Sequence, residues 1–192
     1  MEPDIEELRK NYERLDDTRI IRLASEEATE LRPEALDLLK QIIKERGLSP
    51  VLSDAIAVQF KQLDDKTLLS YCELLRKLPC PQCNAVNEKL NGNMIATLAG
   101  GYYFENFKVA CPTCLDKAYS RANLKIALTG WWRFPGLFNT PRALVFNKKM
   151  KKLDHIGEAS DLLKVFVTQQ AGRIELNRNN PEGLTDILLY PR

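Results

Sequence analysis

The chain has one histidine and two tryptophans among 192 residues, and it lacks any long run of uncharged apolar residues. Charged residues and prolines interrupt the most apolar stretch, residues 124–146, so we predict no membrane-spanning helix. The opening sequence MEPDIEELRK is acidic and lacks the basic and apolar regions of a secretory signal. We therefore expect a cytoplasmic protein.

The sequence also lacks the short motifs of common enzyme active sites. It contains no GxxxxGK(S/T) phosphate loop, no GxGxxG and no HExxH. The sole histidine, His155, can be combined on paper with Ser160 or with Cys72, but no spacing supports either set. Cys72 lies among leucines at helical spacing, which is typical of a buried core cysteine. We expect a protein that is not an enzyme.

Charge is distributed unevenly along a chain whose composition is otherwise that of a soluble globular protein. Residues 1–79 carry 13 basic and 17 acidic side chains, whereas residues 108–152 carry 10 basic and one acidic. An anion-facing surface is therefore expected in the middle of the chain.

Residues 1–79 have the pattern of a helical bundle. Apolar residues recur at helical spacing, and aspartates or prolines precede each apolar run as capping or first-turn residues. Asp16 or Asp17, Pro33, Ser49-Pro50 and Asp64 or Asp65 mark the predicted helix starts, and Gly47 marks a stop.

The pattern changes to short strands between residues 84 and 109. The stretches AVNEKL, MIATL and YYFENFKV are separated by glycine-containing turns, which predicts a three-stranded antiparallel sheet. In the last part, residues 151–192, Ser160 is predicted to cap a helix that ends at Ala171-Gly172. A short strand at RIEL and a short terminal helix are expected to follow.

Four of the five cysteines form two matched pairs. CPQC provides Cys80 and Cys83, CPTC provides Cys111 and Cys114, and 27 residues separate the pairs. Two CxxC pairs can complete a tetrahedral shell of four sulfurs, which zinc accepts and which leaves no position for a catalytic water. Disulfides, a redox CxxC centre and iron are the alternatives. The spacing favours a structural Zn²⁺ ion.

These residues resemble the zinc-ribbon family over residues 80–115. In that family a glycine often follows each CPxC pair, whereas this chain has Asn84 and Leu115 there. Asparagine tolerates a positive φ and leucine does so poorly. The segment GWWRFPGLFNTP, which follows the pairs, is similar to one in uncharacterised bacterial zinc-ribbon proteins, some of them membrane-associated. The sequence PEALDLLKQIIKERGL resembles a short helical motif of bacterial proteins of unknown function. These resemblances imply a bacterial accessory protein without a stated activity.

Three hypotheses suit the aromatic segment 130–149 and the lysines that follow it. Its rings could pack over the ribbon, with Pro135-Gly136 and Thr140-Pro141 breaking the chain as it wraps around a neighbour. They could instead stack on unpaired bases, or lie at an anionic bilayer surface. The candidate binding surface consists of Trp131, Trp132, Arg133, Phe134, Arg142, Lys148, Lys149, Lys151 and Lys152.

The sequence thus predicts an α+β protein in three parts: a helical bundle (1–79), a Cys₄ zinc ribbon with an aromatic and basic extension (80–150), and an α/β segment packed on the ribbon (151–192). We expect a non-enzymatic, zinc-stabilised adaptor that binds protein partners. A nucleic-acid-binding module using residues 121–152 is the first alternative, and an accessory protein at a membrane surface is the second.

Overall fold

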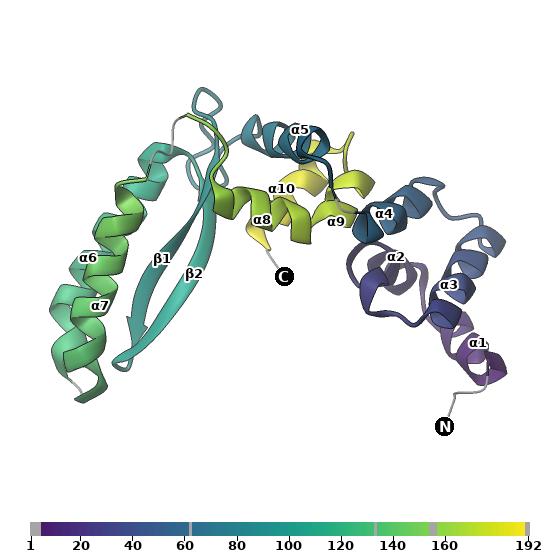
Figure 1. Cartoon of the computed structure of the whole chain (residues 1–192), viewed down its shortest axis with the longest axis horizontal. Coiled ribbons are helices and arrows are strands. Elements are labelled where there is room, and N and C mark those ends of the chain that lie inside the picture. The colour runs from purple at the N-terminus through teal and green to yellow at the C-terminus, as the bar shows by residue number, and fades with distance from the viewer. Residues whose placement is uncertain (1–4, 62, 133, 154–156, 191–192) are drawn as a thin grey trace. The chain divides into compact units, whose positions relative to one another are not determined.

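The computed structural model describes residues 5–61, 63–132, 134–153 and 157–190, and of Trp132 only the backbone. These residues form ten α-helices, two 3₁₀ helices and one two-stranded antiparallel sheet (Figure 1). The mixture confirms the predicted α+β class. The chain forms two compact units, residues 1–67 with 167–187 and residues 68–166 with 188–192. The domain boundaries after residues 79 and 150 stay predictions.

The first unit consists of helices around one apolar core. Asp16 caps a helix by accepting a hydrogen bond from the backbone N–H of Arg19 (2.8 Å), as predicted. Pro33 occupies the first turn of the next helix. Gly47 lies just after the end of that helix and has a φ of +63°. The elements are α1 (Ile5–Glu13), α2 (Asp17–Glu26), η1 (Ala28–Glu30), α3 (Pro33–Glu45), α4 (Val51–Phe60), α9 (Ala171–Leu176) and most of α10 (Pro181–Leu189).

The strand expected at RIEL is wrong, because these residues lie in helix α9. Ile174 is fully buried, and α9 packs on α2 and α4 of the same unit. The helix predicted to end at Ala171-Gly172 does end there, since α8 (Asp161–Gln169) stops just before these residues. Gly172 lies in the first turn of α9, where a Cβ atom would collide with the carbonyl oxygen of Ser25. Packing on two helices therefore overrides the strand tendency of this short apolar run. No strand occurs in the described residues after 151.

The second unit is built on a β-hairpin. Strand β1 (Asn91–Ala99) pairs antiparallel with β2 (Tyr102–Ala110), from Asn91 opposite Ala110 to Ala99 opposite Tyr102. Gly100 and Gly101 form the turn, both with positive φ. The expected third strand at AVNEKL is wrong. Its residues form an irregular loop whose ends are held by hydrogen bonds from Cys80 N–H to the Ala85 carbonyl and from Leu90 N–H to the Arg76 carbonyl.

The aromatic segment lies in a helical hairpin. Helix α6 (Pro112–Thr129) is followed by η2 (Gly130–Trp132) and α7 (Phe134–Lys151), and α6 and α7 lie side by side next to the β-hairpin (Figure 1). The expected breaks are wrong, since Pro135 lies in the first turn of α7 and Pro141 lies inside this helix. A first-turn proline costs no helical hydrogen bond, and an interior one removes a single donor. Helices α5 (Asp65–Arg76) and α8 (Asp161–Gln169) also contribute to this unit.

Glycines rather than tryptophans explain the shape of the turn between α6 and α7. A Cβ atom on Gly136 would collide with the Gly130 carbonyl oxygen, and one on Gly130 would collide with the Thr140 hydroxyl. The side chain of Asn139 donates a hydrogen bond to the Gly101 carbonyl (2.8 Å) and so ties α7 to the β-turn. The segment therefore needs its glycines for close backbone approach.

One buried asparagine connects α7 to the outer edge of β1. Asn147 accepts a hydrogen bond from the N–H of Ala96 (2.7 Å) and donates to the carbonyl of the same residue (3.0 Å) and to Asn123 (2.9 Å). It thereby satisfies a strand edge that has no second strand to pair with. Buried backbone groups without partners are costly, so this side chain replaces a missing strand.

We predict that Asn147→Ala lowers the free energy of unfolding of the second unit by about 2 to 4 kcal/mol, because it leaves both backbone groups of Ala96 unpaired. Thr140 of the same helix provides a matched comparison, since its hydroxyl is buried and has no hydrogen-bond partner among the described residues. Thr140→Val should therefore leave stability unchanged or raise it. Urea unfolding followed by circular dichroism measures both, and equal losses would contradict this account.

No helix in the described parts of the chain combines the length and apolar character needed to cross a bilayer.

Candidate metal centre

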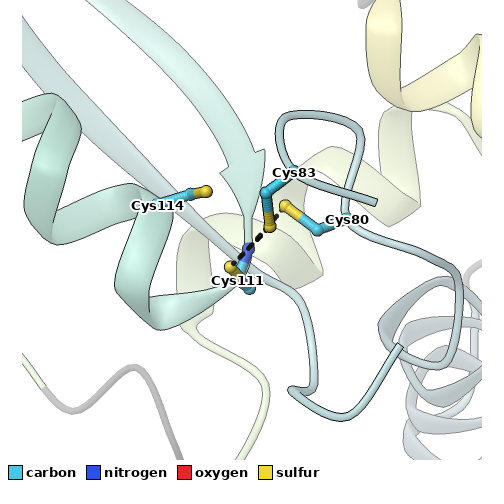
Figure 2. Close-up of side chains that lie close together, drawn as sticks. All are labelled: Cys80, Cys83, Cys111 and Cys114. Atoms are coloured by element: carbon cyan, nitrogen blue, oxygen red, sulfur yellow. Dashed lines mark hydrogen bonds between the residues drawn. The ribbon is translucent and has the colours of Figure 1, made fainter. Parts of the chain in front are cut away.

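The first cysteine pair lies in a tight loop before β1. The N–H of Asn84 donates to the Cys80 carbonyl (2.7 Å), and Asn84 has a φ of +58°. Among the described residues, Asn84 is the only one other than glycine with a positive φ. This is the left-handed conformation that the sequence analysis expected at this position. The turn brings the Cys80 and Cys83 side chains onto the same side of the loop (Figure 2).

The second cysteine pair lies at the start of a helix and not in a second such loop. Cys111 follows β2 directly and is the residue before the first turn of α6, and Pro112 occupies the first helical position. The N–H groups of Cys114 and Leu115 both donate to the Cys111 carbonyl (3.0 Å each). Leu115 is helical and fully buried, so no positive φ is required of it. The two cysteine pairs therefore have different backbone conformations, and a positive φ is needed only after the first pair.

The four side chains converge on one point (Figure 2). Their sulfur atoms all lie within 4.8 Å of one another, and the sulfurs of Cys83 and Cys111 are 3.7 Å apart. That distance is far longer than a disulfide bond, and all four cysteines are free. Four sulfurs at about 2.3 Å from a tetrahedral zinc ion would be about 3.8 Å apart. The donor set and its spacing fit a metal ion held by thiolates.

The electrostatics of the cluster favour a bound cation. Burial raises the pKa of Cys111, and it also raises the pKa of Cys114, which the neighbouring Cys83 thiol raises further. Burial opposes ionisation of Cys80 too, but backbone N–H groups, that of Cys111 first, lower its pKa to about 7. Four thiolates this close repel one another, so a divalent cation is the natural counterpart that keeps them ionised.

Residues around the cysteines fix the helix that carries two of them. Glu88 accepts hydrogen bonds from the Thr113 hydroxyl (2.9 Å) and from the Thr113 N–H (3.3 Å), in the first turn of α6. These bonds lower the pKa of Glu88. A carboxylate here caps the helix and interacts favourably with its dipole. The Glu88 loop therefore holds the start of α6 against the first cysteine pair.

Cys72 and Ser160 have structural roles. Cys72 is fully buried in α5, and burial raises its pKa to about 11. It lies outside the cysteine cluster, as expected. Ser160 caps α8 by accepting the N–H of Leu163 (3.1 Å) and donates to the Gly92 carbonyl (2.6 Å), so its predicted capping role is confirmed. His155 lies outside the described residues.

No protein-family model, curated protein or solved structure matches this chain.

The residues of the candidate binding surface are spread along α7. Trp131 and Phe134 are exposed at its beginning, while the lysines are exposed at its end, and residues 134 and 148 are about 21 Å apart along a helix axis. Arg142 lies between them with its guanidinium 4.5 Å from the ring centroid of Tyr103. The side chain of Trp132 and all of Arg133 lie outside the described residues. The exposed lysines are Lys148, Lys149, Lys151 and Lys152, and Lys151 is 3.8 Å from Asp116.

The candidate binding surface predicted from the sequence does not include four basic residues that line a groove beside the cysteine cluster. Lys108 on β2 and Lys117, Arg121 and Lys125 on α6 line one groove. Two sequence signals place these residues on a common face within each element, but neither brings the two elements together. Alternate residues of a strand share a face, and residues four apart on a helix share a face. The set became visible only when the strand and the helix were placed side by side.

We expect the purified protein to contain one zinc ion per chain. Cys114→Ser should lose most of this zinc and unfold the second unit, because a serine hydroxyl is a poor zinc ligand and a structural zinc contributes directly to folding. Cys72→Ala is the matched control and should keep the metal. Metal content and tryptophan emission during urea unfolding measure both effects. Full zinc content in Cys114→Ser, or unchanged unfolding after metal removal, would contradict the assignment.

Proposed function

We propose that the protein is a non-enzymatic binding protein whose second unit is held together by a structural Zn²⁺ ion. The carrying observation is the set of four converging cysteine sulfurs, which would fill the coordination shell of zinc and leave no position for water or substrate. The ion would connect the first cysteine loop to the start of α6, and through β2 to the β-hairpin. Its role is then to position surfaces, not to react.

The surface best suited to a protein partner is the apolar tip of the helical hairpin. We use this name for six exposed apolar side chains near the turn between α6 and α7: Leu124, Leu128, Trp131, Phe134, Leu137 and Phe138. The rings of Phe134 and Phe138 contact each other edge to face, with centroids 5.9 Å apart. Exposed apolar groups gathered in this way mark interaction sites, and aromatic residues are enriched in protein interfaces.

The exposure of the apolar tip favours a binding role over the hypothesis that the whole aromatic segment packs in a core. Phe134 is 77% exposed and Trp131 is 48% exposed, whereas a ring that completes the core of the unit would be covered. Phe146, further along α7, does pack on the sheet beside Tyr103. The segment therefore divides into a part that packs and a part that faces solvent. The solvent-facing part supports binding as the function.

We predict that Trp131 emits like a tryptophan in water. In a Trp132→Phe variant Trp131 is the only tryptophan, and its half-exposed ring should give a red-shifted emission maximum that acrylamide quenches efficiently. Emission spectroscopy of the zinc-loaded variant checks this. A blue-shifted, poorly quenched spectrum would place the ring in a core and remove it from the apolar tip.

Site-specific cross-linking in the source cells tests the binding function. A photoreactive phenylalanine analogue in place of Phe138 should form a cross-link to a protein of defined mass. The same analogue in place of Val165, which is equally apolar and 55% exposed on α8, should not. Cd²⁺ in place of Zn²⁺ should leave the cross-link intact, because a structural ion takes no part in chemistry. Cross-links to lipid alone would favour the membrane-surface alternative, and none at all would contradict the proposal.

A further inference from the structure

The second unit contains a groove beside the cluster of four cysteines. It has a volume of about 540 Å³ and lies between one face of the β-hairpin and α6. Cys83 and Cys114 line the end that is nearest the cysteine cluster. Ile95 gives the groove an apolar wall, and Thr97 and Asn106 line it as well. A hydrogen bond from Asn106 to the Thr97 hydroxyl (2.9 Å) joins the two strands on this face. All of its lining belongs to the second unit.

The groove is strongly basic. Lys108, Lys117, Arg121 and Lys125 line it, and no carboxylate is found among its described lining residues. None of these four cations forms an ion pair within the described part of the chain. Residues 117–153 contain nine lysines or arginines and no aspartate or glutamate, so neighbouring residues add to the positive electrostatic potential of the groove. Such a one-sided arrangement is complementary to an anion with several charges.

The spacing of the cations indicates a linear anion. Lys117, Arg121 and Lys125 follow one another at intervals of four residues on α6, which is about 6 Å along a helix axis. This repeat is close to the distance between successive phosphates in an extended single strand of nucleic acid. Lys108 faces them from β2 and is oriented by a hydrogen bond to the Gln82 side chain (3.1 Å).

The same face of the sheet continues into two exposed aromatic residues. Alternate residues of a strand share a face, so Tyr102 and Phe104 lie on the side of β2 that carries Asn106 and Lys108. Their cross-strand partners, Ala99 and Thr97, are small. Tyr102 is 61% exposed and Phe104 is 50% exposed. They are about 7 Å apart along the strand, so each ring can receive one base of a strand whose phosphates follow α6.

We propose that this groove binds single-stranded nucleic acid. The phosphates contact the three cations of α6 and Lys108, and unpaired bases stack on Phe104 and Tyr102. Stacking requires bases that are not paired, which is why the occupant is a single strand and not a duplex. An acidic protein segment could use the cations but would make no such use of the two rings. The proposal is independent of the apolar tip, which lies outside this groove.

Fluorescence anisotropy with labelled homopolymer strands of about ten nucleotides tests the proposal on the zinc-loaded full chain. We expect affinity to fall with salt, with a slope of log K against log salt of about −3, because each neutralised phosphate contributes about −0.7. Arg121→Glu with Lys125→Glu should weaken binding by about tenfold or more and reduce the slope. Lys40→Glu with Lys44→Glu changes net charge equally at two exposed lysines of α3 in the first unit and is the matched control.

Removal of one ring tests the stacking separately. Phe104→Ala should weaken binding by about 5- to 100-fold while leaving the salt slope unchanged, whereas Phe134→Ala, which removes an even more exposed ring at the apolar tip, should have little effect. Equal losses of affinity in the two double charge variants would contradict the groove as the binding site. Duplex binding as tight as single-strand binding would overturn the stacking. Displacement by polyglutamate, with no effect of Phe104→Ala, would identify an acidic protein segment as the occupant instead.

Discussion

The four cysteine sulfurs lie within 4.8 Å of one another, and this is the constraint on which the second unit depends. Ionised thiols at such distances repel, and this repulsion opposes the hydrogen bonds from Thr113 to Glu88 that hold the loop of the first pair to the start of α6. A bound cation turns that repulsion into attraction to a common centre. The β-hairpin connects the two pairs, so the same centre fixes the sheet and the helix beside it.

A hairpin of two strands has two open edges and rarely folds alone. Here the neighbouring helices supply what further strands would provide. Asn147 from α7 bonds to both backbone groups of Ala96 on the outer edge of β1, and Tyr119 from α6 donates a hydrogen bond to the Met94 carbonyl (3.1 Å). The stability of the hairpin therefore depends on the helical hairpin, and the position of the helical hairpin depends on the metal centre.

This dependence explains why so much of the unit can remain exposed. An ion in the cysteine cluster, together with a few buried hydrogen bonds, would hold the scaffold, so the apolar tip and the basic groove need not take part in a core. One surface is apolar and aromatic, and the other carries four cations with no carboxylate among its described lining residues. Surfaces so different in chemistry would suit different partners, which supports the binding function that we propose.

The sequence by itself determined the features that rest on local chemistry. Helix caps at Asp16 and Ser160, the positive φ of Asn84 and the metal-binding character of the CxxC pairs follow from single residues and their immediate neighbours. Only the tertiary structure decided that AVNEKL is a loop, that RIEL is a helix, and that Pro141 lies inside α7. RIEL is helical because Ile174 is buried against α2 and α4, and AVNEKL forms a loop held by hydrogen bonds such as that from Thr113 to Glu88. These outcomes depend on contacts with distant parts of the chain. For the same reason the groove could not be foreseen, since its cations lie on a strand and a helix that only folding brings together.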